Sequence, residues 1–130
     1  MPYETIWEDK GIYWKYQGIL TGDELLKSNV NIYGDARFDK LRYQIVDMLN
    51  VESFDIITQK MEELTVMDMA ASRSNSTIVV AIVSTRIQAK RLVDIYKNTS
   101  GSGAPWETEI FESVEDARVW ITSKSGIAFE

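Results

Sequence analysis

Thr77-Ile78-Val79-Val80-Ala81-Ile82-Val83 is an unbroken run of mostly β-branched apolar residues. The run is too short for a typical helix, and it lacks the polar alternation of a strand with one side in solvent. It therefore predicts a strand that is covered on both faces and that lies at the centre of a sheet.

Helix and strand signals alternate on the C-terminal side of this run. Thr85 and Gln88 have the spacing of a capping box, and Ser113 stands where a second helix cap is expected. The elements expected there are a helix from Thr85 to near Asn98, a linker at Thr99–Pro105, a strand at Trp106–Phe111 and a helix after Ser113.

The N-terminal side begins with two strand-like segments separated by the turn residues Asp9-Lys10-Gly11, which predict a hairpin. Thr21 and Glu24 form another capping-box pattern. The elements expected there are strands at Tyr3–Glu8 and Ile12–Tyr16, a helix from Thr21 to near Gly34, a strand at Leu41–Met48, a loop at Asn50–Ser53 and a helix from Ile56 to Ser72.

This order of elements predicts an α/β fold, because strands that alternate with helices form parallel sheets covered by those helices. We expect one domain over residues 1–130, with a mixed sheet of about five strands and about four helices. In that sheet the hairpin precedes the parallel strands. Residues 123–130 are expected to form a loosely held tail.

The residue composition excludes several kinds of catalytic and metal-binding chemistry. The chain of 130 residues has no Cys and no His, which excludes disulfides, thiolate metal sites and imidazole catalysis. Adjacent carboxylates such as Glu62 and Glu63 diverge on a helix and cannot flank one bond. We therefore expect no enzyme activity, no metal and no cofactor.

The net charge and the hydropathy pattern indicate which partners and which cellular location are to be expected. A net charge of −6 disfavours nucleic acid, because the phosphate backbone is repelled. The longest apolar stretch, Ile78 to Val83, is far shorter than the ~20 residues of a membrane helix. The N-terminus lacks the basic start and apolar centre of a signal peptide. We expect a cytoplasmic protein without integral membrane association.

The segment Asp47-Met48-Leu49-Asn50-Val51-Glu52-Ser53-Phe54-Asp55 resembles a conserved junction of STAS domains, because Asp47, Val51, Phe54 and Asp55 have the family's spacing. The segment from Ile110 to Ile121 is similar to the end of the SpoIIAA-like branch called STAS/SEC14, a group of small bacterial proteins. The resemblance implies a SpoIIAA-like fold. It also implies a regulatory or protein-binding module, like the anti-sigma-factor antagonists, and association in pairs as a possible homodimer.

The phosphorylated serine of the family's regulatory members is absent from the matching positions of this chain. Regulatory members carry a phosphorylated serine where this chain has Ile56 and Ile57. Ser53 and Thr58 are the neighbouring hydroxyls, but Asp55 would repel a phosphate and no arginine lies within the loop. Asp55 is more simply a helix N-cap and Thr58 a first-turn residue. We therefore predict that neither hydroxyl is phosphorylated.

Two sets of residues are candidates for binding a protein partner. The first surrounds the position of the family's switch and comprises Ser53, Asp55 and Thr58. The second is a basic helix face, which is either a docking surface for acidic groups or a solvated face. Its cations are Arg86, Lys90 and Lys97.

The alternative function is a small apolar-ligand or lipid carrier, which the SEC14 part of the family name suggests. Met61, Asp68 and Met69 would line its site. Met61 shares a helix face with Leu64 and is expected in the core, whereas Met69 points elsewhere. Asp68 falls close to the apolar face, so we expect it either at the edge of the core or in a polar pocket.

Overall fold

A computed structural model describes residues 3–99, 101 and 103–129. Of the linker expected at 99–105, positions 100 and 102 lie outside the described residues. Over the described residues, the structure has a five-stranded mixed sheet and four α-helices, as the sequence predicted. The strands are β1 (Tyr3–Trp7), β2 (Gly11–Thr21), β3 (Tyr43–Asp55), β4 (Val79–Val83) and β5 (Glu107–Phe111). The helices are α1 (Gly22–Tyr33), α2 (Thr58–Ser72), α3 (Ile87–Asn98) and α4 (Val114–Ser125), with a short 3-10 helix at Ala36–Lys40.

The strands lie in the order β1-β2-β3-β4-β5. The hairpin pair β1/β2 is antiparallel and the other three pairs are parallel. The central strand is therefore β3, which corrects the expectation that the apolar run at 77–83 is central. The hairpin adds two strands on one side of β3, and β4 takes the next place on the other side.

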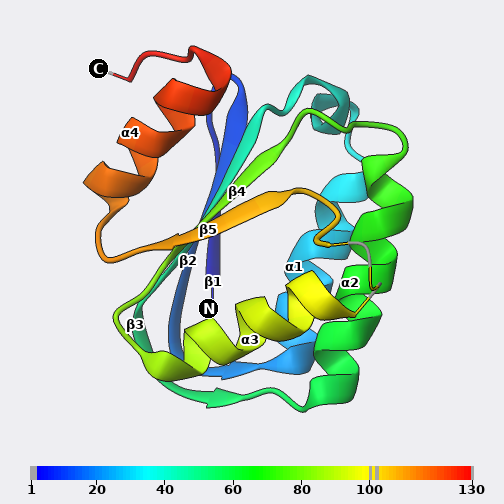
Figure 1. Ribbon diagram of the computed structural model, residues 1–130, viewed down its shortest axis with the longest axis vertical. Helices are drawn as coiled ribbons and strands as arrows, with labels where there is room; N and C mark the ends of the chain where they lie inside the picture. Colours follow the sequence, from blue (N-terminus) through cyan, green and yellow to red (C-terminus); the bar gives the residue numbers. More distant parts are fainter. Residues whose placement is uncertain (1–2, 100, 102, 130) are drawn as a thin grey trace.

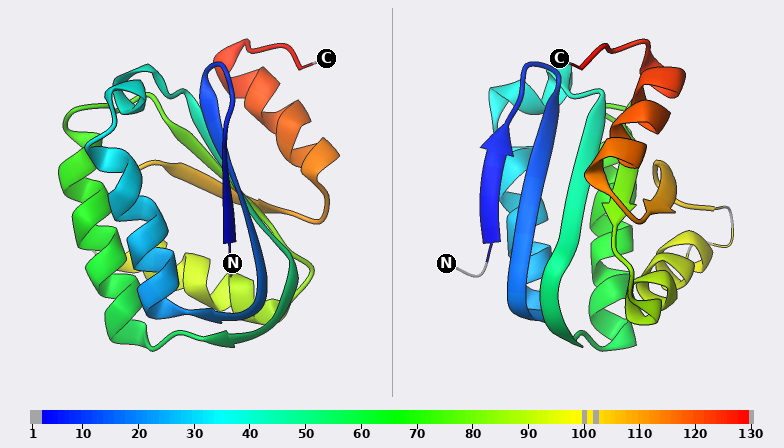
Figure 2. Two further views of the ribbon diagram at one scale, coloured as in Figure 1. Left: turned by 180° about the vertical axis from the view of Figure 1, so that it is seen from behind. Right: turned by 90° about the vertical axis from the view of Figure 1, so that its left-hand side faces the viewer.

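The sheet is covered on both faces (Figures 1 and 2). Helices α1, α2 and α3 cover one face, where Val80 and Ile82 of β4 belong to the larger core cluster. Helix α4 covers the other face, where Ala81 and Val83 pack with Ile121. The alternation of β4 residues between two cores explains why its sequence is apolar throughout.

Strand β3 is longer than expected, and the predicted loop at Asn50–Ser53 is wrong. These residues continue the strand because Gln17–Thr21 of β2 supply backbone partners for them. The register shifts around Gly18, whose φ of 66° is a left-handed conformation that glycine adopts without a Cβ penalty. The paired extension runs beneath the helical layer and leads into α1 and α2 (Figure 1).

Two of the four predicted helix caps are confirmed. The side chain of Thr21 accepts from Glu24 N at 3.2 Å, and that of Ser113 accepts from Asp116 N at 3.1 Å. The capping box at Thr85 is wrong, because α3 begins after Arg86 with no side-chain cap, while Ser84 Oγ accepts from Arg86 N at 3.1 Å.

Residues 123–129 differ from the loose tail that was expected at 123–130, and position 130 lies outside the described residues. Helix α4 continues to Ser125 and ends at Gly126, whose φ of 76° permits a left-handed C-cap. Ile127 and Phe129 then pack against the α4 core, where the ring of Phe129 meets that of Tyr43 edge-on at 5.3 Å. These apolar contacts hold the segment in place, because they remove apolar surface from water.

Candidate functional site

Ser53 and Asp55 lie on the extension of β3, opposite Ile19 and Thr21 of β2. Both side chains are exposed. Asp55 is not the N-cap of the next helix, which corrects the sequence interpretation. Ile57 occupies that position, with no side-chain cap, because β3 extends through Asp55 and Ile56 turns into the core.

Thr58 opens α2 and contacts a residue of α3. Arg91 Nη2 donates to Thr58 Oγ1 at 3.1 Å. An arginine therefore reaches this position from another helix, although the loop itself contains none. Arg91 could not be identified as a site residue from the sequence, because its contact with Thr58 depends on how α3 crosses the start of α2.

Exposed apolar side chains gather at the same end of the sheet. Ile19 and Leu49 are 60% and 42% exposed, and they line a surface groove together with Arg86. Ile87, which follows Arg86, is 78% exposed. Parallel strands end at one edge of a sheet, which explains why residues so distant in sequence meet here. We call Ile19, Leu49, Thr58, Arg86, Ile87 and Arg91 the strand-end surface.

The predicted basic face is only partly at this surface. Lys90 is exposed on α3, one turn beyond Arg86. Lys97 lies near the other end of α3 and approaches Glu109 of β5 at 3.9 Å. Within the described part of the chain, no carboxylate forms an ion pair with Arg86, Lys90 or Arg91. The structure therefore separates Lys97 from the other two predicted cations.

Asp68 lies inside the helical layer rather than at its edge and is 3% exposed. Tyr33 of α1 donates to its Oδ1, and the hydroxyl of Tyr96 of α3 donates to its Oδ2 at 2.7 Å. Burial raises the pKa of the Asp68 carboxyl to about 6, and the two tyrosine hydrogen bonds act in the opposite direction.

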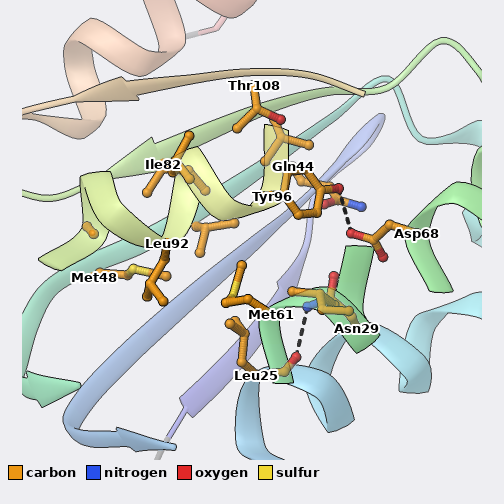
Figure 3. A pocket seen from close by; sticks show the side chains of 15 residues that line it. Leu25, Asn29, Gln44, Met48, Met61, Asp68, Ile82, Leu92, Tyr96 and Thr108 are labelled. Carbon is orange, nitrogen blue, oxygen red and sulfur yellow. Dashed lines mark hydrogen bonds between the residues drawn. The ribbon is translucent and has the colours of Figure 1, made fainter. Parts of the chain in front are cut away.

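A cavity of about 50 Å³ adjoins Asp68 (Figure 3). Met61 lines it as the ligand hypothesis expected, whereas Met69 does not. Gln44 of β3 also lines it, and its Nε2 has no hydrogen-bond partner among the described residues. Sequence reasoning missed Gln44 because nothing local distinguishes it within a buried strand.

The described residues form neither a metal-binding cluster nor a membrane-spanning helix. Over residues 3–99, 101 and 103–129, no three His, Cys, Asp or Glu side chains are arranged to hold a metal ion. Within the same residues, no helix is both long and apolar enough to span a bilayer.

Comparison with known proteins identifies the fold. No protein-family model matches the chain, and no curated protein matches it in sequence. The structure resembles that of the unphosphorylated anti-sigma factor antagonist SpoIIAA, with a TM-score of 0.62 and 13% identity over 98% of this chain and 99% of that chain. It also matches an uncharacterised DUF3478-family protein with a SpoIIAA-like fold from Shewanella loihica PV-4, with a TM-score of 0.49 and 15% identity over 92% and 91% of the two chains. The chain thus has the SpoIIAA-like α/β fold that the sequence resemblance implied.

Proposed function

We propose that this chain is a non-catalytic regulatory module that docks a protein partner at the strand-end surface. The observation that carries the proposal is the exposure of Ile19, Leu49 and Ile87 at one end of the sheet. Apolar side chains gathered next to polar ones are typical of protein contact sites.

The charges around these side chains indicate the chemistry of the partner. Arg86, Lys90 and Arg91 lie on the α3 side, whereas Glu52 and Asp55 lie on the β3 side. A complementary partner would present apolar side chains at its centre and carboxylates opposite α3. Such charges steer association and select the partner, while the apolar contacts provide most of the affinity.

The cavity beside Asp68 favours docking over the lipid-carrier alternative. Its volume is about 50 Å³, whereas pockets for drug-sized ligands measure roughly 300–1,000 Å³. A lipid chain would require displacement of the packed side chains of α2 and α3. The cavity beside Asp68 is therefore too small to support the carrier hypothesis.

Phosphorylation is not part of the proposal. Ile56 and Ile57 have no hydroxyl to accept a phosphate, and Ser53 lies on a paired strand. Thr58 has a cation beside it in Arg91, so the prediction that Thr58 is not modified now depends on the repulsion from Asp55 alone. Phosphopeptide mapping of the protein from its source cells tests this prediction.

The docking proposal is tested by affinity purification from source cells with the wild type and two variants. Ile87→Glu places a charge on the proposed surface, and Val119→Glu is the matched control on α4, because Val119 is 71% exposed. Circular dichroism first checks that both variants fold. We expect the partner to be retained by Val119→Glu and reduced at least about tenfold by Ile87→Glu.

A direct binding measurement with the purified partner completes the test. Arg86→Glu should weaken binding, and the loss should diminish at high salt, because screening removes the charge interaction. Equal recovery of the same proteins by the wild type, Ile87→Glu and Val119→Glu would exclude this surface. Light scattering of the wild type separately tests the expected homodimer.

A further inference from the structure

One buried carboxylate connects all three helices of the larger layer. Asp68 belongs to α2, and it accepts hydrogen bonds from Tyr33 in the last turn of α1 and from Tyr96 near the end of α3. Figure 3 shows the side chain of Asp68 directed at the hydroxyl of Tyr96. The contacts between α2 and its two neighbours at this end therefore depend on the acceptor capacity of a single group.

The cavity beside Asp68 provides space and polar atoms for water. A volume of about 50 Å³ exceeds the roughly 10–15 Å³ that one water molecule needs. Gln44 Nε2 is a buried donor without a partner among the described residues, and Gln44 is only 2% exposed. In Figure 3 Gln44, Tyr96 and Asp68 lie together on one side of the cavity, and Met48 and Leu92 lie on the other.

Among the residues that the structure describes, no cation forms an ion pair with Asp68. The groups that face it are the phenols of Tyr33 from α1 and Tyr96 from α3, with Tyr16 of β2 close enough to interact electrostatically. Gln44 of β3 and Thr108 of β5 are uncharged, and the described residues that line the cavity include no Lys or Arg. Burial is therefore the dominant influence, and it raises the pKa of Asp68 to about 6.

We propose that Asp68 is an internal proton-binding site, and that its protonation releases Tyr33 from α2. The ionised carboxylate accepts from both tyrosine hydroxyls in charge-assisted bonds. A proton that arrives through water in the cavity converts one carboxylate oxygen into a hydroxyl, and no other bond forms or breaks. The carboxyl group then carries no charge, so both tyrosines lose a charged acceptor, and the hydrogen bond to the protonated oxygen is the one that breaks. Tyr33 is the one released, because it is only half-buried and can bond to solvent instead, whereas Tyr96 is buried.

The proposal is tested by NMR of the whole protein with ¹³C-labelled Asp and Tyr, titrated from pH 4.5 to 7.5. We expect the Asp68 carboxyl resonance to titrate with a midpoint near pH 6, and the Tyr33 ring resonances to move with the same midpoint. An Asp68 midpoint near pH 4, or Tyr33 resonances that stay unchanged while Asp68 titrates, would overturn the proposal.

Variants separate this effect from general acid sensitivity. In Asp68→Asn, which preserves the shape of the group, the Tyr33 shift should disappear. Asp94→Asn, at an exposed position on α3, should leave the shift intact. Persistence of the Tyr33 shift in Asp68→Asn would assign it to another group and refute the proposal.

Should Asp68→Asn fail to fold, Tyr33→Phe gives a second test, because the Asp68 midpoint should then rise with the loss of a donor to the ionised form. These outcomes do not depend on the docking proposal.

Discussion

Tyr43 packs its ring directly against the backbone of Gly11, at a place where any side chain on Gly11 would overlap the ring. Tyr43 is 2% exposed, its hydroxyl donates to Glu8, and its ring contacts that of Phe129. The ring therefore has no room to move aside. Gly11, which the sequence assigned to the turn, has no positive φ, so what requires a glycine at this position is the close packing of Tyr43.

Gly11→Ala should lower the free energy of unfolding by about 1–3 kcal/mol, because overpacking displaces a buried ring. Gly34→Ala is the control, since its Cβ would meet nothing within 4 Å. Urea denaturation with both variants gives the comparison. An equal, small change in both would show that the Tyr43 ring adjusts freely.

Phe129→Ala should cost about 1 kcal/mol of stability. The ring of Phe129 contacts Tyr43, and the guanidinium of Arg118 lies 4.6 Å from its centroid. Ala128→Gly, at a neighbouring exposed position, controls for changes in the chain end. An unchanged thermal midpoint in Phe129→Ala would mean that the segment after Gly126 contributes nothing, as a loose tail would.

The order of helices and strands was predictable because its signals are local. The caps at Thr21 and Ser113 and the apolar run in β4 each lie within one element. The extension of β3 was not predictable, because residues 50–53 are mostly polar and become a strand only through pairing with β2. Strand length here is set by the partner rather than by the segment itself.

In the candidate site, too, the features with local sequence signals were predictable and those that depend on tertiary packing were not. Spacing along α2 placed Asp68 close to the apolar face of the helix, and the side chain is 3% exposed in the structure. The partners of Asp68 come from α1 and α3, and Gln44 comes from β3. Such a cluster exists only in the packed tertiary structure, so no single stretch of sequence carries its pattern.

Gln44→Met should leave the protein as stable or raise its free energy of unfolding by about 1 kcal/mol. The substitution preserves volume and removes a buried amide donor that has no hydrogen-bond partner among the described residues. Thr108→Val, which removes a hydroxyl that donates to Trp106 O at 2.9 Å, should destabilise by a similar amount. A loss of more than about 1 kcal/mol in Gln44→Met would indicate that the amide has a hydrogen-bond partner that matters.

Asp68→Asn should change how stability depends on pH. The pKa of Asp68 is about 6 in the folded protein and 3.8 in its ordinary state, so between pH 4 and 6 the folded chain holds a proton that the unfolded chain lacks. This contribution to stability is fully present below pH 4 and is lost as the pH rises through 6. Because one pKa unit corresponds to about 1.4 kcal/mol, the loss amounts to roughly 3 kcal/mol by pH 7.

The variant cannot ionise, so its stability relative to the wild type should rise by that amount from pH 4 to pH 7. Glu8 and Asp35, whose pKa values are lowered, affect both proteins equally and cancel in the difference. Urea denaturation of both proteins at each pH measures it, and a difference that stays constant across this range would show that Asp68 titrates like an ordinary surface carboxylate.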